Sequence, residues 1–491
     1  MTEIRSDFVA KRYAAERRFK YYGAGALVIT ALFLLFLISD IAIKGFPAFF
    51  EHRATVEVTI DPAKVDAAKP QAGDFDGIVK DAFRSLFPAA KSRADRKALG
   101  GLLSQGAADD LRDMVVANPA LIGQTLKVPA LLSDDADLYF KGMQTGLKIT
   151  AGAGTLQIAQ SGEEYVITGD TGDLREGQII RANGGALRIT KLEGSTVVAE
   201  AVLAPETLNT AVAGQWDMLT LSVKEAERRV NDKQVVWMEQ LRSSGVIEKS
   251  IAWRFFTSGD SREAELAGLK GALVGSLLTV AVALLLALPL GIAAAIYLEQ
   301  FAPKNKLTDI IEVNINNLAA VPSIIFGLLG LAVFLNFFGL PRSAPVAGGL
   351  VLALLVLPTI IIAARAALKA VPPSITEAAL GVGASKQQAV FQHVLPLAIP
   401  GILTGTILGL ARAFGETAPL LMIGMVAFIA DVPQGFEDAA TVLPVQIYLW
   451  SDLPEIAFQS KTAAAILVLM VVLFGLNAIA IYLRKRFERR W

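Results

Sequence analysis

Residues 371–396 read VPPSITEAALGVGASKQQAVFQHVLP, and this polar stretch separates two long apolar segments. Pro372 ends the preceding helix, because residues next to a proline disfavour the helical conformation. Ser374 is followed three residues later by Glu377, a spacing that predicts a capping box at the start of a new helix. The stretch therefore begins with a short helix between two membrane-spanning segments.

The second half of the same stretch predicts another short helix. Gly383 weakens the first helix and allows a turn. Ser385 predicts the cap of a second helix, which we expect to end before Pro396. Two short helices at an angle, held at a membrane surface, follow from this pattern.

The segments on either side are long and apolar, and 53% of the 491 residues are hydrophobic. A helix needs about 20 apolar residues to cross a bilayer. A first span is expected over 23–45, because this run follows a basic arm (1–22) and no small-residue cleavage site follows it. Five further spans are predicted at about 268–298, 311–338, 346–370, 398–430 and 462–483. The fold class is therefore an all-α polytopic membrane protein with six transmembrane helices, whose core covers 266–485.

A polar region, 46–265, lies between the first and second spans. It predicts helices over 74–118 and short alternating strands with glycine-rich turns over 146–221. We expect an inserted α+β domain with no recognisable chemical motif.

Lysine and arginine in short loops indicate the orientation. The arm 1–22, the tail 484–491 and the loop at Lys304 and Lys306 are basic, and six spans place all three on one side. That side is expected to be cytoplasmic, with both termini and the stretch 371–396. The domain 46–265 is then expected in the periplasm.

Several chemistries are not supported by the composition. The chain has no cysteine and two distant histidines, so we expect no metal site and no catalytic dyad. It has no phosphate-binding G-x-x-x-x-G-K-[ST] loop. We therefore expect no bound cofactor and no enzymatic activity, with any ATP and magnesium used by a separate ATPase chain.

Charged residues inside the fifth apolar segment point to function. Arg412 and Glu416 are four residues apart, so they share a helix face and can pair. Gly415 and Pro419 allow the helix to bend or unwind there. A guanidinium group suits an anion pathway because its planar donors match phosphate oxygens. A purely structural ion pair is equally compatible with this pattern.

The stretch 371–396 resembles the EAA loop of bacterial ABC-importer permeases, which docks on a cytoplasmic ATPase. The resemblance implies a type I ABC-importer permease fold. His393 departs from the apolar residue usual two positions before the Leu-Pro pair. The residues that match and would couple to the ATPase are Glu377, Ala378, Ala379, Gly383, Leu395 and Pro396.

The string A-R-x-x-G-E-T-A-P-L at 411–420 is similar to PstA-type permeases of phosphate importers, and so are strings at 255–257, 291–299 and 321–327. The resemblance implies a permease in the bacterial inner membrane with Arg412, Glu416 and Thr417 on the substrate pathway. It also implies four partners: a PstC-like second permease subunit, a PstB-like ATPase dimer, a periplasmic PstS-like phosphate-binding protein and inorganic phosphate.

Arg365 departs from the PstA-type pattern, and Ser323 is a further candidate for the substrate pathway. Many PstA-like chains carry an arginine a few residues after a Leu-Pro pair, whereas here Arg365 is displaced by almost one turn. It is a candidate for the pathway, although reaching toward the interface fits the displacement better. Ser323 is a further candidate, but the Pro322-Ser323 pair more simply marks a kink. With its inserted domain the chain resembles a subset of the family that carries a long insertion of unassigned function between the first two spans.

Three alternative functions are also compatible with the sequence. The nearest is an ABC permease for another oxyanion, such as sulfate or molybdate. A secondary transporter fits less well, because acidic residues are not spread through several spans. A membrane-anchored sensor or scaffold built on the inserted domain is the third.

Overall fold

The computed structural model describes residues 2–143, 146–194 and 196–487. Residue 1 of the basic arm and residues 488–491 of the basic tail therefore lie outside the described residues. The chain divides into two compact units. The helical unit comprises Met1–Phe49, Trp253–Arg262 and Leu266–Trp491, and the α+β domain comprises Phe50–Ala252 and Glu263–Glu265.

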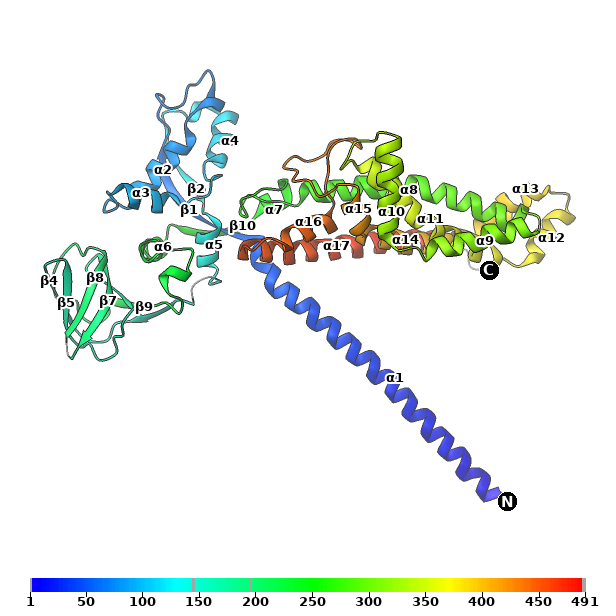
Figure 1. The fold of residues 1–491 in the computed structure, drawn as a ribbon, viewed down its shortest axis with the longest axis horizontal. Helices are drawn as coiled ribbons and strands as arrows, with labels where there is room; N and C mark the ends of the chain where they lie inside the picture. Colours follow the sequence, from blue (N-terminus) through cyan, green and yellow to red (C-terminus); the bar gives the residue numbers. More distant parts are fainter. Residues whose placement is uncertain (1, 144–145, 195, 488–491) are drawn as a thin grey trace. The chain divides into compact units, whose positions relative to one another are not determined.

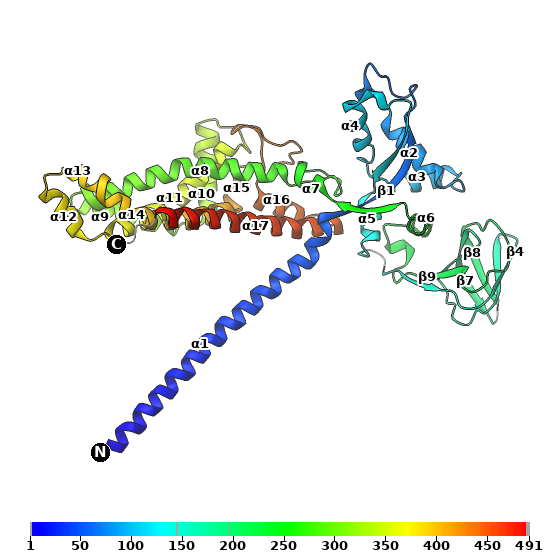
Figure 2. The ribbon, with the colours of Figure 1, turned by 180° about the vertical axis from the view of Figure 1, so that it is seen from behind.

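The helical unit contains long apolar helices with short connecting helices (Figures 1 and 2). The long helices are α1 (Thr2–Gly45), α8 (Lys270–Ile296), α11 (Pro345–Lys369), α14 (Leu395–Gly415) and α17 (Ile456–Phe487). The shorter ones are α7 (Trp253–Thr257), α9 (Lys306–Ala319), α10 (Ser323–Gly330), α12 (Pro373–Gly381), α13 (Lys386–Gln388), α15 (Ala418–Met422) and α16 (Leu443–Ser451). Three π-helical segments, Tyr297–Phe301, Leu331–Phe337 and Ala389–Val394, extend α8, extend α10 and precede α14.

Five helical segments among the described residues are long and apolar enough to cross a membrane, and a bent pair makes six if it is one span. The first, α1, continues without a break from the basic arm into the apolar run. Its apolar side chains, such as Leu27 and Phe36, are mostly exposed. At its end, Gly45 lies against the backbone of Ala463 and Ala464 in α17.

Helix α11 lies at the centre of this unit, packed against α8 and α14. Small residues make the close approach possible, because lipid gives helices little reason to associate other than good packing. Gly349 faces Val282 of α8, and Gly405 of α14 faces Ala363. Phe326, Val351, Leu420 and other buried side chains fill the core beside α11.

Two predicted spans are interrupted. The segment predicted at 311–338 is a pair of helices, α9 and α10, bent by 100° at a break that contains Pro322. This confirms the predicted kink and corrects the single straight span, because a helix cannot easily continue through the residue before a proline. The segment predicted at 398–430 is helical only to Gly415, where Glu416 is extended before α15 begins. The predicted bend near Gly415 and Pro419 is confirmed.

The α+β domain has two sheets and several helices. A three-stranded antiparallel sheet has the order β10 (Ile247–Ile251), β1 (Phe50–Thr59), β2 (Thr125–Leu131). Its helices are α2 (Phe75–Ser85), α3 (Arg93–Gly100), α4 (Asp109–Ala117), α5 (Asp134–Phe140) and α6 (Asp232–Ser243). Alternate residues of β1 and one stripe of α2, including Phe75 and Phe83, enter a common core with Trp237 of α6.

A seven-stranded antiparallel sheet forms the β-rich unit that was expected over 146–221. Its strands are β3 (Lys148–Ala151), β4 (Leu156–Ser161), β5 (Glu164–Gly169), β6 (Ile179–Ala182), β7 (Gly185–Glu193), β8 (Thr196–Leu203) and β9 (Trp216–Thr220). The order is β3-β9-β6-β7-β8-β5-β4, so the two edge strands are consecutive in the chain. Leu156 of β4 also bridges Ala211, just before β9, so the sheet curls back on itself around an apolar core.

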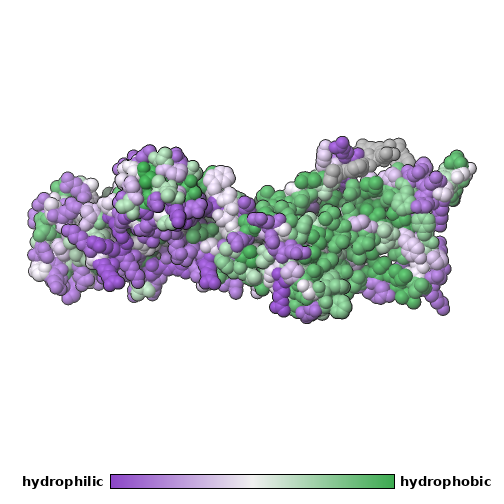
Figure 3. All heavy atoms as spheres, turned by 90° about the horizontal axis from the view of Figure 1, so that it is seen from above, coloured by the Kyte–Doolittle hydropathy of each residue, from purple (hydrophilic) through white to green (hydrophobic). Residues whose placement is uncertain are grey.

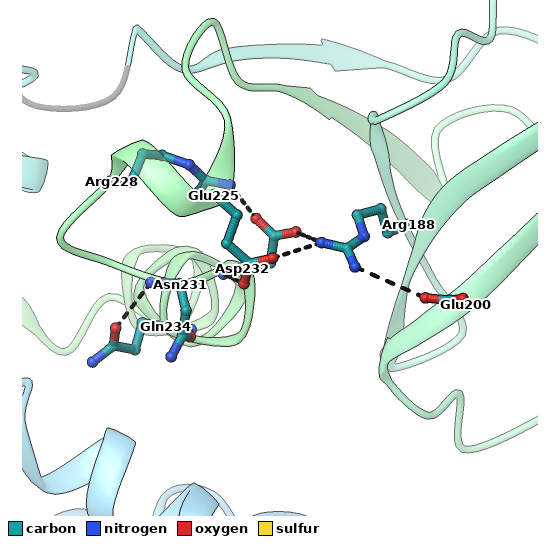
Figure 4. A network of polar contacts seen from close by, with 7 residues as sticks. All are labelled: Arg188, Glu200, Glu225, Arg228, Asn231, Asp232 and Gln234. Atoms are coloured by element: carbon teal, nitrogen blue, oxygen red, sulfur yellow. Dashed lines mark hydrogen bonds and ion pairs between the residues drawn. The ribbon is translucent and has the colours of Figure 1, made fainter.

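An ionic network, buried at Arg228 and Asp232 and partly exposed at Arg188 and Glu225, ties this sheet to helix α6 (Figure 4). Asp232, at the start of α6, is paired with Arg228 and lies 3.0 Å from Nη1 of Arg188 in β7. Arg188 also binds Glu225 at 2.6 Å, and Asn231 forms a capping box with Gln234. The side chains of Arg228 and Asp232 are 4% and 5% exposed, so the pair compensates charges that would otherwise be costly to bury.

Candidate functional site

The break between α14 and α15 places Arg412, Glu416 and Thr417 together. Arg412 lies in the last turn of α14, where a cation interacts favourably with the helix dipole. Its Nε lies 3.4 Å from Oε1 of Glu416, which confirms that the two side chains pair. Glu416 is extended, and Thr417 precedes α15 without a side-chain cap bond.

The ion pair with Glu416 uses only some of the N–H donors of the Arg412 guanidinium. Its side chain is 46% exposed, whereas that of Glu416 is 18% exposed. Among the residues that the structure describes, Arg412 has no second charged partner. A guanidinium carries five N–H donors, so this arrangement leaves donors able to bind an oxyanion.

The backbone around the pair is well packed. Ala413 and Phe414 precede it and are buried, and Pro419 and Leu420 follow it and are also buried. A Cβ on Gly327 of α10 would lie only 2.7 Å from Cα of Pro419. The break is therefore a defined position in the helical unit.

Arg365 lies in a different group of charges. Its Nη2 is 2.6 Å from Oε1 of Glu312 in α9 and 3.6 Å from Oε2 of Glu299, in the π-helical segment after α8. Neither glutamate was predicted as a partner of Arg365, although each lies at one end of an apolar segment, where a charge can pair with a neighbouring helix. Ser323 is the first residue of α10. No ion pair or hydrogen bond among the described residues links Arg365 or Ser323 to Arg412.

The stretch 371–396 differs in part from its predicted form. Helix α12 begins at Pro373 with no side-chain cap, so the capping box expected from Ser374 and Glu377 is wrong. Proline at the first helical position has a suitable φ, and its missing N–H is one of the donors that have no partner within the helix in any case. The turn at Gly383 is confirmed, with a φ of +92° that only glycine adopts without strain.

The second helix of this stretch is longer than expected. Ser385 forms a capping box with Gln388, which confirms the predicted cap. The helix does not end before Pro396 but continues as Lys386–Gly415, so its first turns are part of the span. The π-helical segment before Pro396 accommodates the continuation, because its altered bonding suits a residue without an N–H.

The surface of this stretch exposes several of the residues expected to contact an ATPase. Glu377, Ala378 and Gly383 are exposed, Ala379 is buried, and Leu395 and Pro396 are half-buried. Val382 is 87% exposed and Phe391 is 48% exposed. The stretch therefore presents exposed apolar side chains on both sides of the turn at Gly383, which suits docking.

No group of three or more His, Cys, Asp or Glu residues in the described part of the chain could hold a metal ion. The nearest arrangement to a dyad is His52 with Asp137 in the α+β domain, 2.9 Å apart.

Comparison with known proteins finds two family models that match parts of the chain. Residues 287–491 match the family model "Binding-protein-dependent transport system inner membrane component", and residues 7–146 match a "Domain of unknown function (DUF3333)". The PstA 1 phosphate transport system permease protein of Mycobacterium tuberculosis (strain CDC 1551 / Oshkosh) is 31% identical over 52% of this chain and 83% of its own length. The probable ABC transporter permease YqgI of Bacillus subtilis (strain 168) is 30% identical over 46% of this chain and 82% of its own.

Among solved structures, an inward-facing MetNI methionine ABC transporter matches 45% of this chain and 95% of its own, with 18% identity and a TM-score of 0.35. The two permeases named above, YqgI and PstA 1, are each matched over more than four fifths of their own length. The chain is thus a multi-pass membrane permease with a separate sheet-containing domain. It belongs to the PstA-type family of phosphate transport system permeases.

Proposed function

We propose that the chain is the transmembrane subunit of an ATP-driven importer that passes inorganic phosphate from a periplasmic binding protein into the cytoplasm. The observation that carries this proposal is the half-exposed guanidinium of Arg412 at a helix break, with Glu416 as its single ionic partner among the described residues. Guanidinium groups bind phosphate oxygens with paired hydrogen bonds.

Each residue at the break has a distinct part in the proposal. Arg412 receives the anion, and Glu416 holds the guanidinium in place and limits its net charge. That limit matters, because a site in a transport pathway must release its ligand as well as bind it. The hydroxyl of Thr417 can donate one further hydrogen bond.

The stretch 371–396 is the proposed contact with the ATPase. Its exposed apolar residues and the turn at Gly383 support docking. ATP and magnesium are then bound by that partner, a PstB-like dimer, and this chain binds no cofactor itself. A PstC-like second permease subunit and a PstS-like binding protein complete the complex, with both termini of this chain in the cytoplasm.

The test is phosphate uptake by the reconstituted complex with R412Q. A hydrogen bond to a charged group contributes about 1.5–3 kcal/mol, so uptake should fall at least about tenfold. The control is K369Q, which removes an exposed cation from the last turn of α11 and should leave uptake unchanged. Normal uptake by an assembled R412Q complex would refute the role of this arginine.

The same assay separates phosphate from other oxyanions. Excess sulfate or molybdate should not compete with labelled phosphate in the wild-type complex. Competition by either anion would favour a permease of broader or different oxyanion specificity.

A further inference from the structure

The glutamates around Arg365 form a charge cluster with more negative than positive charge. Arg365 comes from α11, Glu312 from α9 and Glu299 from the π-helical segment Tyr297–Phe301. The three side chains are 22%, 34% and 21% exposed for Arg365, Glu312 and Glu299 respectively. Charged groups in membrane segments are costly and usually functional, and one carboxylate would suffice to neutralise the arginine.

Helix α9 is weakly held by packing. None of its residues is buried, in contrast to the many buried residues of α11. Its half-buried positions are Thr308, Glu312, Ile315 and Ala319, which recur at helical spacing on one face. Glu312 lies within this face and forms the ion pair with Arg365, so a charge contact joins a lightly packed helix to the centre of the unit.

Both ends of α9 are irregular. The π-helical segment that carries Glu299 lies shortly before it, and the 100° break with α10 lies directly after it. Such segments are frequent at functional hinges, because they lack the regular hydrogen bonds that stiffen a helix. In both ribbon views α9 and α12 lie at the same end of the helical unit (Figures 1 and 2).

Helix α9 is also linked mechanically to the break at Arg412. It continues through the bend into α10, where Gly327 lies directly against Pro419. Pro419 follows Glu416 and Thr417 in the chain. A close backbone contact of this kind transmits displacement, because neither side has a flexible side chain to absorb it.

We propose that Glu299, Glu312 and Arg365 form a charge latch that holds α9 against α11 and opens during transport. The two glutamates are positioning residues: they act on the pathway through α9, α10 and Pro419. The link between the latch and transport rests on the proposed function. The statement that the latch holds α9 against α11 does not depend on that function.

The position of α9 can be measured directly, because the chain contains no cysteine. Cysteines introduced at the exposed positions Ile310 in α9 and Leu290 in α8 can carry spin labels in the reconstituted complex. With E299Q and E312Q together, we expect a longer and broader distance distribution by pulsed electron paramagnetic resonance. If the closed latch favours the resting state by the lower end of typical coupling free energies, opening it raises the population of the active state, and ATP hydrolysis without substrate should rise about fivefold or more.

A matched control and a rescue make the test specific. D309N removes an exposed carboxylate from the same helix and should change neither the distance nor the basal ATPase rate. R365E and E312R should each open the latch alone, and the double variant should restore the short distance by reversing the pair.

The outcomes separate the two proposals. Wild-type behaviour of the E299Q/E312Q variant in both measurements would overturn the latch. A changed distance with an unchanged basal ATPase rate would also overturn it, since the pair would then be structural only. If the distances respond as expected but the wild-type complex takes up no phosphate, the proposed function fails and the closing of α9 by these residues stands.

Discussion

The α+β domain buries Asp232 between two arginines, whereas the helical unit leaves the guanidinium of Arg412 half-exposed beside one glutamate. The difference extends to the surfaces. In Figure 3 hydrophobic residues cover much of the helical unit, and hydrophilic residues cover most of the α+β domain. Water solvates the surface charges of the domain, so a charge is buried there only with compensation. In the helical unit, an incompletely paired charge is stronger evidence of a functional site, because lipid cannot solvate it or form hydrogen bonds with it.

The largest effect is expected from breaking the buried network of the α+β domain. D232A leaves Arg228 buried without its carboxylate, and removing one partner of a buried pair costs about 3–5 kcal/mol. Hydrogen exchange of the full chain should show faster exchange in α6 and little change in α11. The control D113A removes an exposed carboxylate and should be neutral. Unchanged protection of α6 would show that apolar packing holds this domain without the network.

A smaller effect is expected at Asp137, with a definite pH dependence. Its Oδ1 accepts hydrogen bonds at 2.9 Å from the backbone N and from Nδ1 of His52. Burial would raise the pKa of Asp137, but the hydrogen bond from His52 and the charge of Lys141 outweigh it and lower that pKa below its ordinary value. The carboxylate therefore contributes stability above the unfolded pKa, about 3.9, and loses it as the pH falls through the folded value.

D137N should accordingly destabilise the α+β domain by about 1.5–3 kcal/mol at neutral pH, and by less below about pH 4. Asp134 is a control for which the opposite change in stability is expected. Burial, and then the charge of Asp135, raise the pKa of Asp134. Its ionisation therefore lowers the stability of the domain as the pH rises through the pKa of the folded state. D134N should therefore stabilise the domain at neutral pH. Thermal unfolding across a pH series measures both, and equal pH profiles for D137N and the wild type would contradict the assignment.

The smallest effect is expected from small-residue packing in the helical unit. A Cβ at Gly405 would overlap Cβ of Ala363, so G405A should force α11 and α14 apart at a cost of about 1–3 kcal/mol. Gly475 of α17 has open space where a Cβ would lie, so G475A is the matched control and should be neutral or slightly stabilising. Thermal unfolding in detergent measures the difference. Equal stabilities would mean that this helix contact is loose.

Local sequence patterns predicted several elements correctly. They failed where the conformation of an adjacent residue or segment changed the start or the end of a helix. The turn at Gly383 and the cap at Ser385 depend on adjacent residues, and both were confirmed. The capping box at Ser374 was wrong because Pro373 starts α12 without a cap. The continuation through Pro396 was missed because a π-helical segment tolerates the proline, and periodicity does not reveal such a segment.

The candidate site shows the same division. The spacing of Arg412 and Glu416 predicted that they pair on one helix face. They do pair, but Glu416 lies just past the end of α14 with an extended backbone, so the pair spans the helix break. The partners of Arg365 could not be predicted, because Glu299 and Glu312 come from separate helices that are far away in the chain. Arg365 was therefore predicted to lie either in the pathway or at the membrane interface, without an ion pair.

The sequence by itself determined the apolar spans, the inserted domain, the helix break near Gly415 and the family, because each depends on composition or on residues close together in the chain. Only the tertiary structure decided the seven-stranded sheet that curls back on itself and the charge cluster at Arg365. Those features depend on contacts between segments that are distant in the chain. Such contacts stabilise the protein only after the chain has lost the entropy needed to bring the segments together, so local sequence patterns do not reveal them. The stretch 371–396 combines both kinds of information: its turn is local, but its second helix belongs to a span.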